Sequence, residues 1–199
     1  MLEARNICLE VDNDGESLFL LSDVNFCIPR GHFTAIVGPS GCGKTTLLKA
    51  IAGIKETTSG TFFWEGRDLA EDGDFEPYEI GYVPQFSIAY EELTVDENVE
   101  SSARLRVDAD EDELDEIIEN ALQETGLSEI ADRPVKLLSG GQKRRLALAM
   151  ELVSSPRILL CDEVTSGLDP RSEREIVQLL HQLSMKDGRI VISVTHSLA

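Results

Sequence analysis

The apolar positions of the chain fall into two patterns, short continuous runs and stripes that repeat every three or four residues. Continuous runs indicate buried strands, and the clearest lie at 32–37, 80–85, 158–161 and 190–194. Stripes indicate helices that bury one face, and they follow residue 46, recur through much of 94–154 and follow residue 170. These strands and helices predict an α/β fold, and the length of 199 residues favours one domain.

The N-terminal third has a different pattern. Residues 2–36 are rich in strand formers, and turn signals lie at 12–15 and 29–31. We therefore expect two or three strands of an antiparallel sheet laid against the α/β core, at 7–11, 18–21 and 24–28. A further strand is predicted at 60–66, where three aromatic residues are expected to pack in the core.

Residues 94–154 are predicted to be helical. Thr94 with Glu97, and Ser139 with Gln142, have the spacing of a capping box. Gly126 is a helix stop. The expected organisation is a core formed by 1–85 and 155–199, which includes the antiparallel part, and a helical subdomain at 86–154.

Composition narrows the function. The chain has 18 basic and 37 acidic residues, a net charge of −19, which argues against non-specific binding to nucleic acid because such binding needs a basic face. Two acidic runs, at 71–76 and 108–119, are interpreted as solvated surface. No apolar run approaches the roughly 20 residues of a membrane span, and the N-terminus lacks a signal-peptide core. We expect a cytosolic chain that would reach a membrane only through a partner.

The strongest chemical signal lies between the strand 32–37 and the helix after it. This segment matches the phosphate-loop pattern G-x-x-x-x-G-K-[ST] without mismatch. Glycines let backbone N–H groups point at a β-phosphate, and the following helix presents its positive end. A lysine charge serves the β- and γ-phosphates, and the last hydroxyl is placed to bind Mg²⁺. The alternative is a glycine-rich turn that matches by chance. The residues are Gly38, Pro39, Ser40, Gly41, Cys42, Gly43, Lys44 and Thr45.

A second signal is the apolar strand 158–161, which ends in two acids. Asp162 is the expected carboxylate partner of Thr45 at the Mg²⁺. Glu163 is placed to orient or deprotonate an attacking water. An ordinary turn with two acids is the alternative, and the phosphate loop makes the catalytic interpretation the better one.

Together these segments resemble the nucleotide-binding domain of ABC ATPases along the whole chain. LSGGQ is the specific motif, because phosphate loops alone occur in many NTPases. The resemblance implies a P-loop NTPase (RecA-like) core with an antiparallel β subdomain and a helical signature-motif subdomain. The family's motifs correspond to Gly38–Thr46 (Walker A), Gln85 (Q-loop), Leu138–Gln142 (signature), Ile158–Glu163 (Walker B and catalytic glutamate), Ser166–Asp169 (D-loop) and His196 (switch histidine).

The resemblance also implies cofactors and partners. ATP would bind the Walker A segment, including Thr46, and would be covered by the signature of a second copy in a head-to-tail homodimer or pseudo-dimer. The domain would lie on the cytoplasmic face of the membrane, attached to a transmembrane permease domain or subunit. The implied catalytic residues are Glu163, His196 and Gln85, the implied Mg²⁺ ligands are Thr45, Gln85 and Asp162, and the implied covering residues are Ser139, Gly140, Gly141 and Gln142.

A finer resemblance is to the half-size pigment and multidrug exporters, the G subfamily. It rests on segments that include Gly81–Gln85, Leu93–Val95 and Ala103–Arg106, and it implies export. Gly15 stands near the place of the family's adenine-stacking aromatic residue, and Phe19 is the nearest candidate. Val164 replaces the family's usual proline, and the family normally continues with further elements after residue 199.

Two rival functions remain. One is a non-transport ABC ATPase that acts on nucleic acid or ribosomes; the ~50 residues between the Q-loop and the signature leave no room for a long coiled coil, and the net charge of −19 opposes it. The other is a regulatory domain that binds ATP without turnover, which the presence of Glu163 and His196 opposes.

Overall fold

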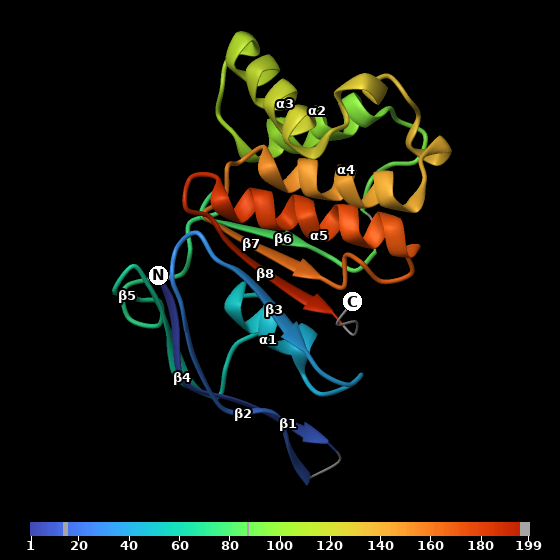
Figure 1. Ribbon diagram of the computed structural model, residues 1–199. Coiled ribbons are helices and arrows are strands. Elements are labelled where there is room, and N and C mark those ends of the chain that lie inside the picture. The colour runs from blue at the N-terminus through green and yellow to red at the C-terminus, as the bar shows by residue number, and fades with distance from the viewer. Residues whose placement is uncertain (14–15, 87, 196–199) are drawn as a thin grey trace.

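Two four-stranded sheets form the framework of the computed structural model, which describes residues 1–13, 16–86 and 88–195 (Figure 1). The first sheet is antiparallel and has the strand order β2-β1-β4-β5. The second is parallel and has the order β3-β8-β7-β6. The strands are β1 (Leu2–Asn13), β2 (Glu16–Ile28), β3 (Phe33–Val37), β4 (Ser59–Trp64), β5 (Arg67–Asp68), β6 (Ile80–Val83), β7 (Ile158–Asp162) and β8 (Ile190–Thr195).

The two strands expected at 18–21 and 24–28 are one long strand, β2. The polar pair between them does not break the strand because the register with β1 shifts there. Asn6 and Asp23 both take a positive φ, and the Asn6 amide donates to Asp23 Oδ1 at 2.8 Å. Such bulges absorb extra residues without ending a strand.

The helices cover the parallel sheet on both faces (Figure 1). Helix α1 packs on the face that also meets the antiparallel sheet, and α4 and α5 pack on the opposite face. Helices α2 and α3 lie beyond α4. The bounds are α1 (Lys44–Ile51), α2 (Val95–Arg106), α3 (Glu111–Thr125), α4 (Gly140–Leu152) and α5 (Pro170–Met185), with short 3₁₀ turns η1 (Ser128–Ile130) and η2 (Val135–Leu137).

The strand β7 belongs to two apolar cores. All five of its residues are buried, as expected for a parallel strand covered on both faces. Ile158 and Leu160 face the core beneath α1, whereas Leu159 and Cys161 face the core of the helical side. This alternation follows from the two-residue period of a strand, and it carries the next residue, Asp162, to the carboxyl edge of the sheet.

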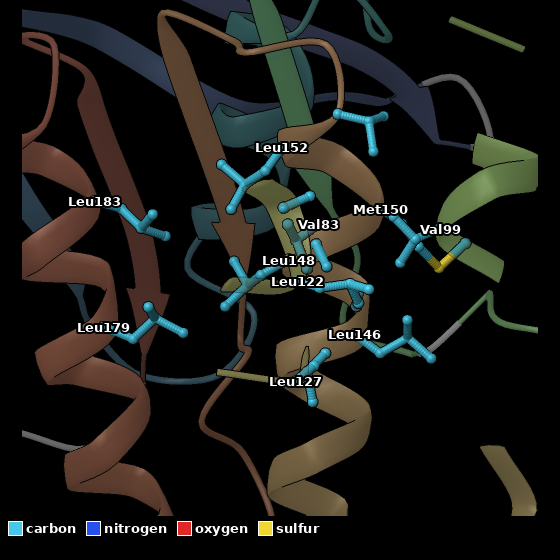
Figure 2. Packing of buried hydrophobic residues seen from close by; sticks show 14 of the residues in the cluster. Val83, Val99, Leu122, Leu127, Leu146, Leu148, Met150, Leu152, Leu179 and Leu183 are labelled. Carbon is cyan, nitrogen blue, oxygen red and sulfur yellow. The ribbon is translucent and has the colours of Figure 1, made fainter. Parts of the chain in front are cut away.

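Helix α4 is the centre of the second core. Figure 2 shows leucines from α3, α4 and α5 converging with Val83 of β6 and Val99 of α2. Leu146 and Met150 of α4 and Val153, which caps its C-terminus, form a buried stripe. Because buried side chains pack closely, this cluster holds the helices in a fixed position against β6 and β7.

The expected helix boundaries are confirmed. Thr94 and Ser139 each form a capping box with the glutamate or glutamine three residues later. Gly126 ends α3 in the left-handed conformation. Asp110 caps α3 in the same way. The acidic residues after it lie in the first turn of α3, where the positive end of the helix dipole stabilises their negative charge. Among the described residues, no helix is both long and apolar enough to cross a membrane.

Candidate functional site

The segment Gly38–Gly43 forms the loop between β3 and α1, as its sequence predicts. Gly41 and Gly43 take φ values of 80° and 94°, which glycine adopts without the steric cost of a side chain. Gly43 precedes the first residue of α1 and offers no side-chain cap. The first backbone N–H groups of α1 therefore face the loop, and its first turn holds no acidic residue.

The loop is held against its surroundings by close contacts. A Cβ atom added to Gly43 would lie 2.6 Å from the carbonyl oxygen of Leu20 in β2. The Lys44 ammonium donates to the carbonyl oxygens of Gly38 and Pro39, both at 2.8 Å. The residue Lys44 is 7% exposed, so its charge is directed inward at the loop. This geometry forms a cradle of backbone N–H groups with one cation at its base.

Asp162 joins this loop through a direct hydrogen bond. The Thr45 hydroxyl donates to Asp162 Oδ1 at 2.8 Å. The second carboxylate oxygen, Oδ2, accepts from the Tyr82 phenol at 3.0 Å. Burial and the neighbouring Asp162 carboxylate raise the pKa of the Tyr82 phenol, so the phenol stays protonated and remains a donor. Residues far apart in the sequence thus converge on one buried carboxylate.

Glu163 and Gln85 form the second pair of the site. Gln85 Nε2 donates to Glu163 Oε2 at 2.8 Å. Glu163 takes a φ of 51°, a backbone conformation that is costly for a residue with a side chain. Two backbone hydrogen bonds hold Glu163 there. Its N–H donates to the Val194 carbonyl oxygen, and the Glu163 carbonyl oxygen accepts from the Ser166 N–H. Strand β7 therefore ends at Asp162, and the chain turns at Glu163.

The signature segment, Leu138–Gln142, lies apart from the phosphate loop. It begins α4 on the face of the parallel sheet opposite α1. Ser139 and Gly140 are exposed, and Ser139 Oγ accepts from the Gln142 N–H at 3.3 Å. This arrangement presents a helix N-terminus outward, and it does not bring these residues into the Thr45–Asp162 cluster.

A cleft of about 340 Å³ lies beside Glu163. It is lined by the Ser166–Leu168 segment, Glu173 and Thr195 as well. Asp169 caps α5 by accepting from the backbone N–H groups of Arg171 and Ser172. The Ser172 hydroxyl, 2.6 Å away, holds the pKa of Asp169 below its ordinary value, and these N–H groups add to the effect. His196, the expected switch histidine, lies outside the described residues.

Two residues of the site were not expected from the sequence. One is Tyr82, whose side chain reaches Asp162. The other is Arg144 of α4, which donates to the Gln85 carbonyl oxygen and so ties the signature helix to the Q-loop. The sequence position of Arg144 near the start of a helix does not predict this contact, because the contact depends on how α4 packs against β6.

The donor set fits a magnesium nucleotide. Hydroxyl and carboxylate oxygens are the hard ligands that Mg²⁺ prefers. Because the Thr45 hydroxyl directs its hydrogen to Asp162, the lone pairs of its oxygen remain for a metal. The glycine loop and the start of α1 suit the phosphates of the same ligand.

Comparison with known proteins agrees with this geometry. The family model described as "ABC transporter" matches residues 21–166. The ABC transporter ATP-binding/permease protein Rv1747 of Mycobacterium tuberculosis is 37% identical over an alignment of 199 residues, and the match covers 99% of this chain and 22% of that protein. The iron(3+)-hydroxamate import ATP-binding protein FhuC of Bacillus subtilis is 37% identical and covers 90% of this chain, and 68% of FhuC is matched. The chain therefore spans about a fifth of the first relative and two thirds of the second.

Solved structures show the same fold. The dimeric structure of MJ0796, a bacterial ABC transporter cassette, has a TM-score of 0.85 and 30% identity, and covers 100% of this chain and 89% of that one. A dimeric post-hydrolysis state of MJ0796 bound to ADP and Pi has a TM-score of 0.82 and 31% identity, with the same coverage. On this evidence the chain belongs to the ABC transporter family and carries its ATP-binding, ATPase domain.

Proposed function

We propose that this domain binds Mg-ATP at the loop Gly38–Thr46 and hydrolyses it to drive a membrane transporter. The observation that carries the proposal is the convergence at one edge of the parallel sheet of two pairs, Thr45 with Asp162 and Gln85 with Glu163. The first pair offers metal ligands, and the second offers a carboxylate fixed by an amide. Metal-held phosphate and an oriented base are the requirements of phosphoryl transfer to water.

Each residue then has a distinct role. The N–H groups of the loop and the start of α1 bind the phosphates, and Lys44 places its charge on the β- and γ-oxygens. Thr45, Asp162 and Gln85 would hold Mg²⁺, which neutralises charge on the phosphate oxygens. Glu163 accepts the proton of the attacking water, and its hydrogen bond from Gln85 restricts the orientation of the carboxylate. His196 contacts the γ-phosphate in this scheme.

A second copy of the domain completes the site. Ser139, Gly140, Gly141 and Gln142 begin a helix whose N-terminus faces outward, a favourable position for a partner's γ-phosphate. The structures of MJ0796, described as dimeric, support the dimer itself. The head-to-tail dimer therefore places each ATP between one loop and the other copy's signature.

A transmembrane permease is the expected partner, and the region around Gln85 is its expected contact. Phe86, Ile88 and Tyr90 are 76%, 57% and 69% exposed. Exposed apolar side chains that gather in one short segment, as these do, suit a contact with a partner. The domain would lie on the cytoplasmic face of the membrane.

Export is the direction we propose, and the G-subfamily resemblance favours it. Rv1747 is described as an ATP-binding/permease protein, a name that states no direction. FhuC, described as an import protein, represents the opposing case. ATP-driven uptake of substrate into inside-out vesicles that contain the whole transporter indicates export, whereas uptake into right-side-out vesicles indicates import.

Base recognition is assigned to Phe19. It lies on β2 with 57% of its surface exposed, next to Leu20, whose carbonyl oxygen abuts Gly43. An exposed ring beside the phosphate loop can stack on adenine. Phe19→Ala should weaken binding of ATP more than binding of inorganic triphosphate.

The decisive experiment compares the wild type with Glu163→Gln. The variant should bind ATP with unchanged affinity, hydrolyse it at least about a hundredfold more slowly, and elute as a dimer in Mg-ATP. Lys44→Ala is the matched control, and should bind no nucleotide and stay monomeric. Hydrolysis by Glu163→Gln at the wild-type rate would refute the assigned base.

A further inference from the structure

Tyr82 stands in an unusual place between the metal carboxylate and the helical side of the domain. It lies in β6 and pairs with Leu160 of β7. Side chains on neighbouring strands share a face when they are paired, and the face repeats every second residue. Tyr82 therefore points to the same face as Leu160 and Asp162, the face that α1 covers.

The phenol completes the hydrogen bonding of Asp162. The carboxylate is buried, with 4% of the residue's surface exposed. Its Oδ1 is bound by Thr45 at 2.8 Å and its Oδ2 by Tyr82 at 3.0 Å. The terminal torsion of an aspartate is soft and has no sharp rotamer. One hydrogen bond leaves the carboxylate free to rotate about it, whereas two bonds on different oxygens fix its plane.

The backbone of Tyr82 is held as firmly as its ring. Its N–H donates to Glu151 Oε2 of α4 at 3.1 Å. Glu151 is in turn paired with Arg106 of α2 through two bonds of 2.5 Å. The phenol is thus anchored from the helical side, and it acts on Asp162 from a fixed position.

We propose that Tyr82 is a positioning residue of the nucleotide site: its phenol holds the Asp162 carboxylate in the orientation that binds Mg²⁺. The inference rests on the proposed binding of Mg-ATP at this loop. Preorganisation of a metal ligand by a neighbouring donor raises metal affinity. Tyr82 should therefore increase the affinity for the magnesium nucleotide and leave the affinity for the metal-free nucleotide unchanged.

The test measures nucleotide affinity in two conditions. ADP is titrated onto the full chain in EDTA and in excess Mg²⁺, so that no hydrolysis intervenes. Tyr82→Phe removes one oxygen and keeps the ring. The control is Tyr78→Phe, because Tyr78 is 57% exposed. We expect Tyr82→Phe to bind ADP normally in EDTA, which also shows that the variant is folded. The factor by which Mg²⁺ increases its affinity for ADP should be about three- to tenfold smaller than in the wild type.

A double-variant cycle identifies the route of the effect. If the phenol acts through Asp162, adding Tyr82→Phe to Asp162→Asn should change the Mg²⁺ gain by less than about twofold. An equal Mg²⁺ gain in Tyr82→Phe and wild type overturns the proposal, as does an undiminished effect of Tyr82→Phe in the Asp162→Asn background. Equal losses in EDTA and in Mg²⁺ also overturn it, because they indicate packing alone. A wild type that binds ADP without any Mg²⁺ dependence would instead refute the magnesium site itself, and the inference with it.

Discussion

Removing Arg106 from its pair with Glu151 should destabilise the fold far more than removing an arginine from an exposed ion pair of the same helix, α2. Glu151 is nearly buried, with 4% of its side chain exposed, and Arg106 is 34% exposed. Both nitrogens of the guanidinium fork meet the carboxylate, each at 2.5 Å. Arg106→Ala would leave this carboxylate inside the protein, where the Tyr82 N–H still donates to it.

The size of the effect follows from this geometry. Breaking a buried ion pair by removing one partner costs about 3–5 kcal/mol. Arg106 reaches solvent, so water can enter after the truncation and part of the cost is recovered, which leaves about 2–3 kcal/mol. With a slope near 2 kcal/mol per molar urea, the unfolding midpoint should fall by about 1–1.5 M.

The neighbouring Arg104 is the matched control. It pairs with Glu100 and Glu111, and all three side chains are well exposed. Exposed pairs are screened by solvent, so Arg104→Ala should leave the urea midpoint nearly unchanged. Adding Glu151→Gln to Arg106→Ala removes the stranded charge and should recover at least about 1 kcal/mol.

Urea unfolding can be followed by circular dichroism and by the fluorescence of Trp64, the single tryptophan. Trp64 is buried in the antiparallel sheet, on the other side of the molecule from α2, so agreement of the two probes tests two-state behaviour. The reasoning is refuted if Arg106→Ala lowers the midpoint no more than Arg104→Ala does.

Two further predictions concern the buried carboxylate of Glu79 and the glycine at position 43. Glu79 is buried, which raises its pKa, but hydrogen bonds from the Glu76 N–H, Arg67 and Trp64 outweigh this and hold the pKa below its ordinary value of 4.5. The ionised Glu79 carboxylate therefore stabilises the fold fully above about pH 4.5, and this stabilisation is lost as the pH falls through the lower folded-state pKa. The difference in free energy of unfolding between wild type and Glu79→Gln should shrink over that range. A difference that is constant with pH would contradict the assignment. Gly43→Ala should destabilise the fold more than Gly66→Ala: both glycines take a positive φ, but only at Gly43 would the new Cβ meet backbone, 2.6 Å from Leu20 O, while nothing lies within 4 Å at Gly66. Thermal unfolding of the two variants checks this, and equal midpoints would contradict it.

The phosphate loop and its carboxylate partner could be predicted because their chemistry is written in short segments. The spacing from Gly38 to Thr45 fixes where the turns and the hydroxyl fall. The apolar run before Asp162 requires a strand that ends at that residue. Capping at Thr94 and Ser139 was equally local, since a capping box involves residues only three apart.

The contacts of Tyr82 and Arg144 could not be predicted in this way. The phenol meets Asp162 only because β6 and β7 pair in one register, with Tyr82 opposite Leu160. Arg144 meets Gln85 only because α4 packs across the end of β6. The same limit explains why β2 was expected as two strands, because its continuity past Asp23 depends on the bulged pairing with β1.

The strand order of the parallel sheet has a consequence for synthesis of the chain. The described strand β3, which leads into the phosphate loop, pairs within its sheet with β8, Phe33 opposite Val191 and Val37 opposite Thr195. The chain up to Thr195 therefore has to leave the ribosome before β3 can pair fully with β8. Contacts of such long range form slowly, and they leave apolar strand surface open to aggregation meanwhile. The nascent chain can close its β1–β2 hairpin early, but β3 and the sheet beneath the nucleotide loop can be assembled only once β8 has emerged.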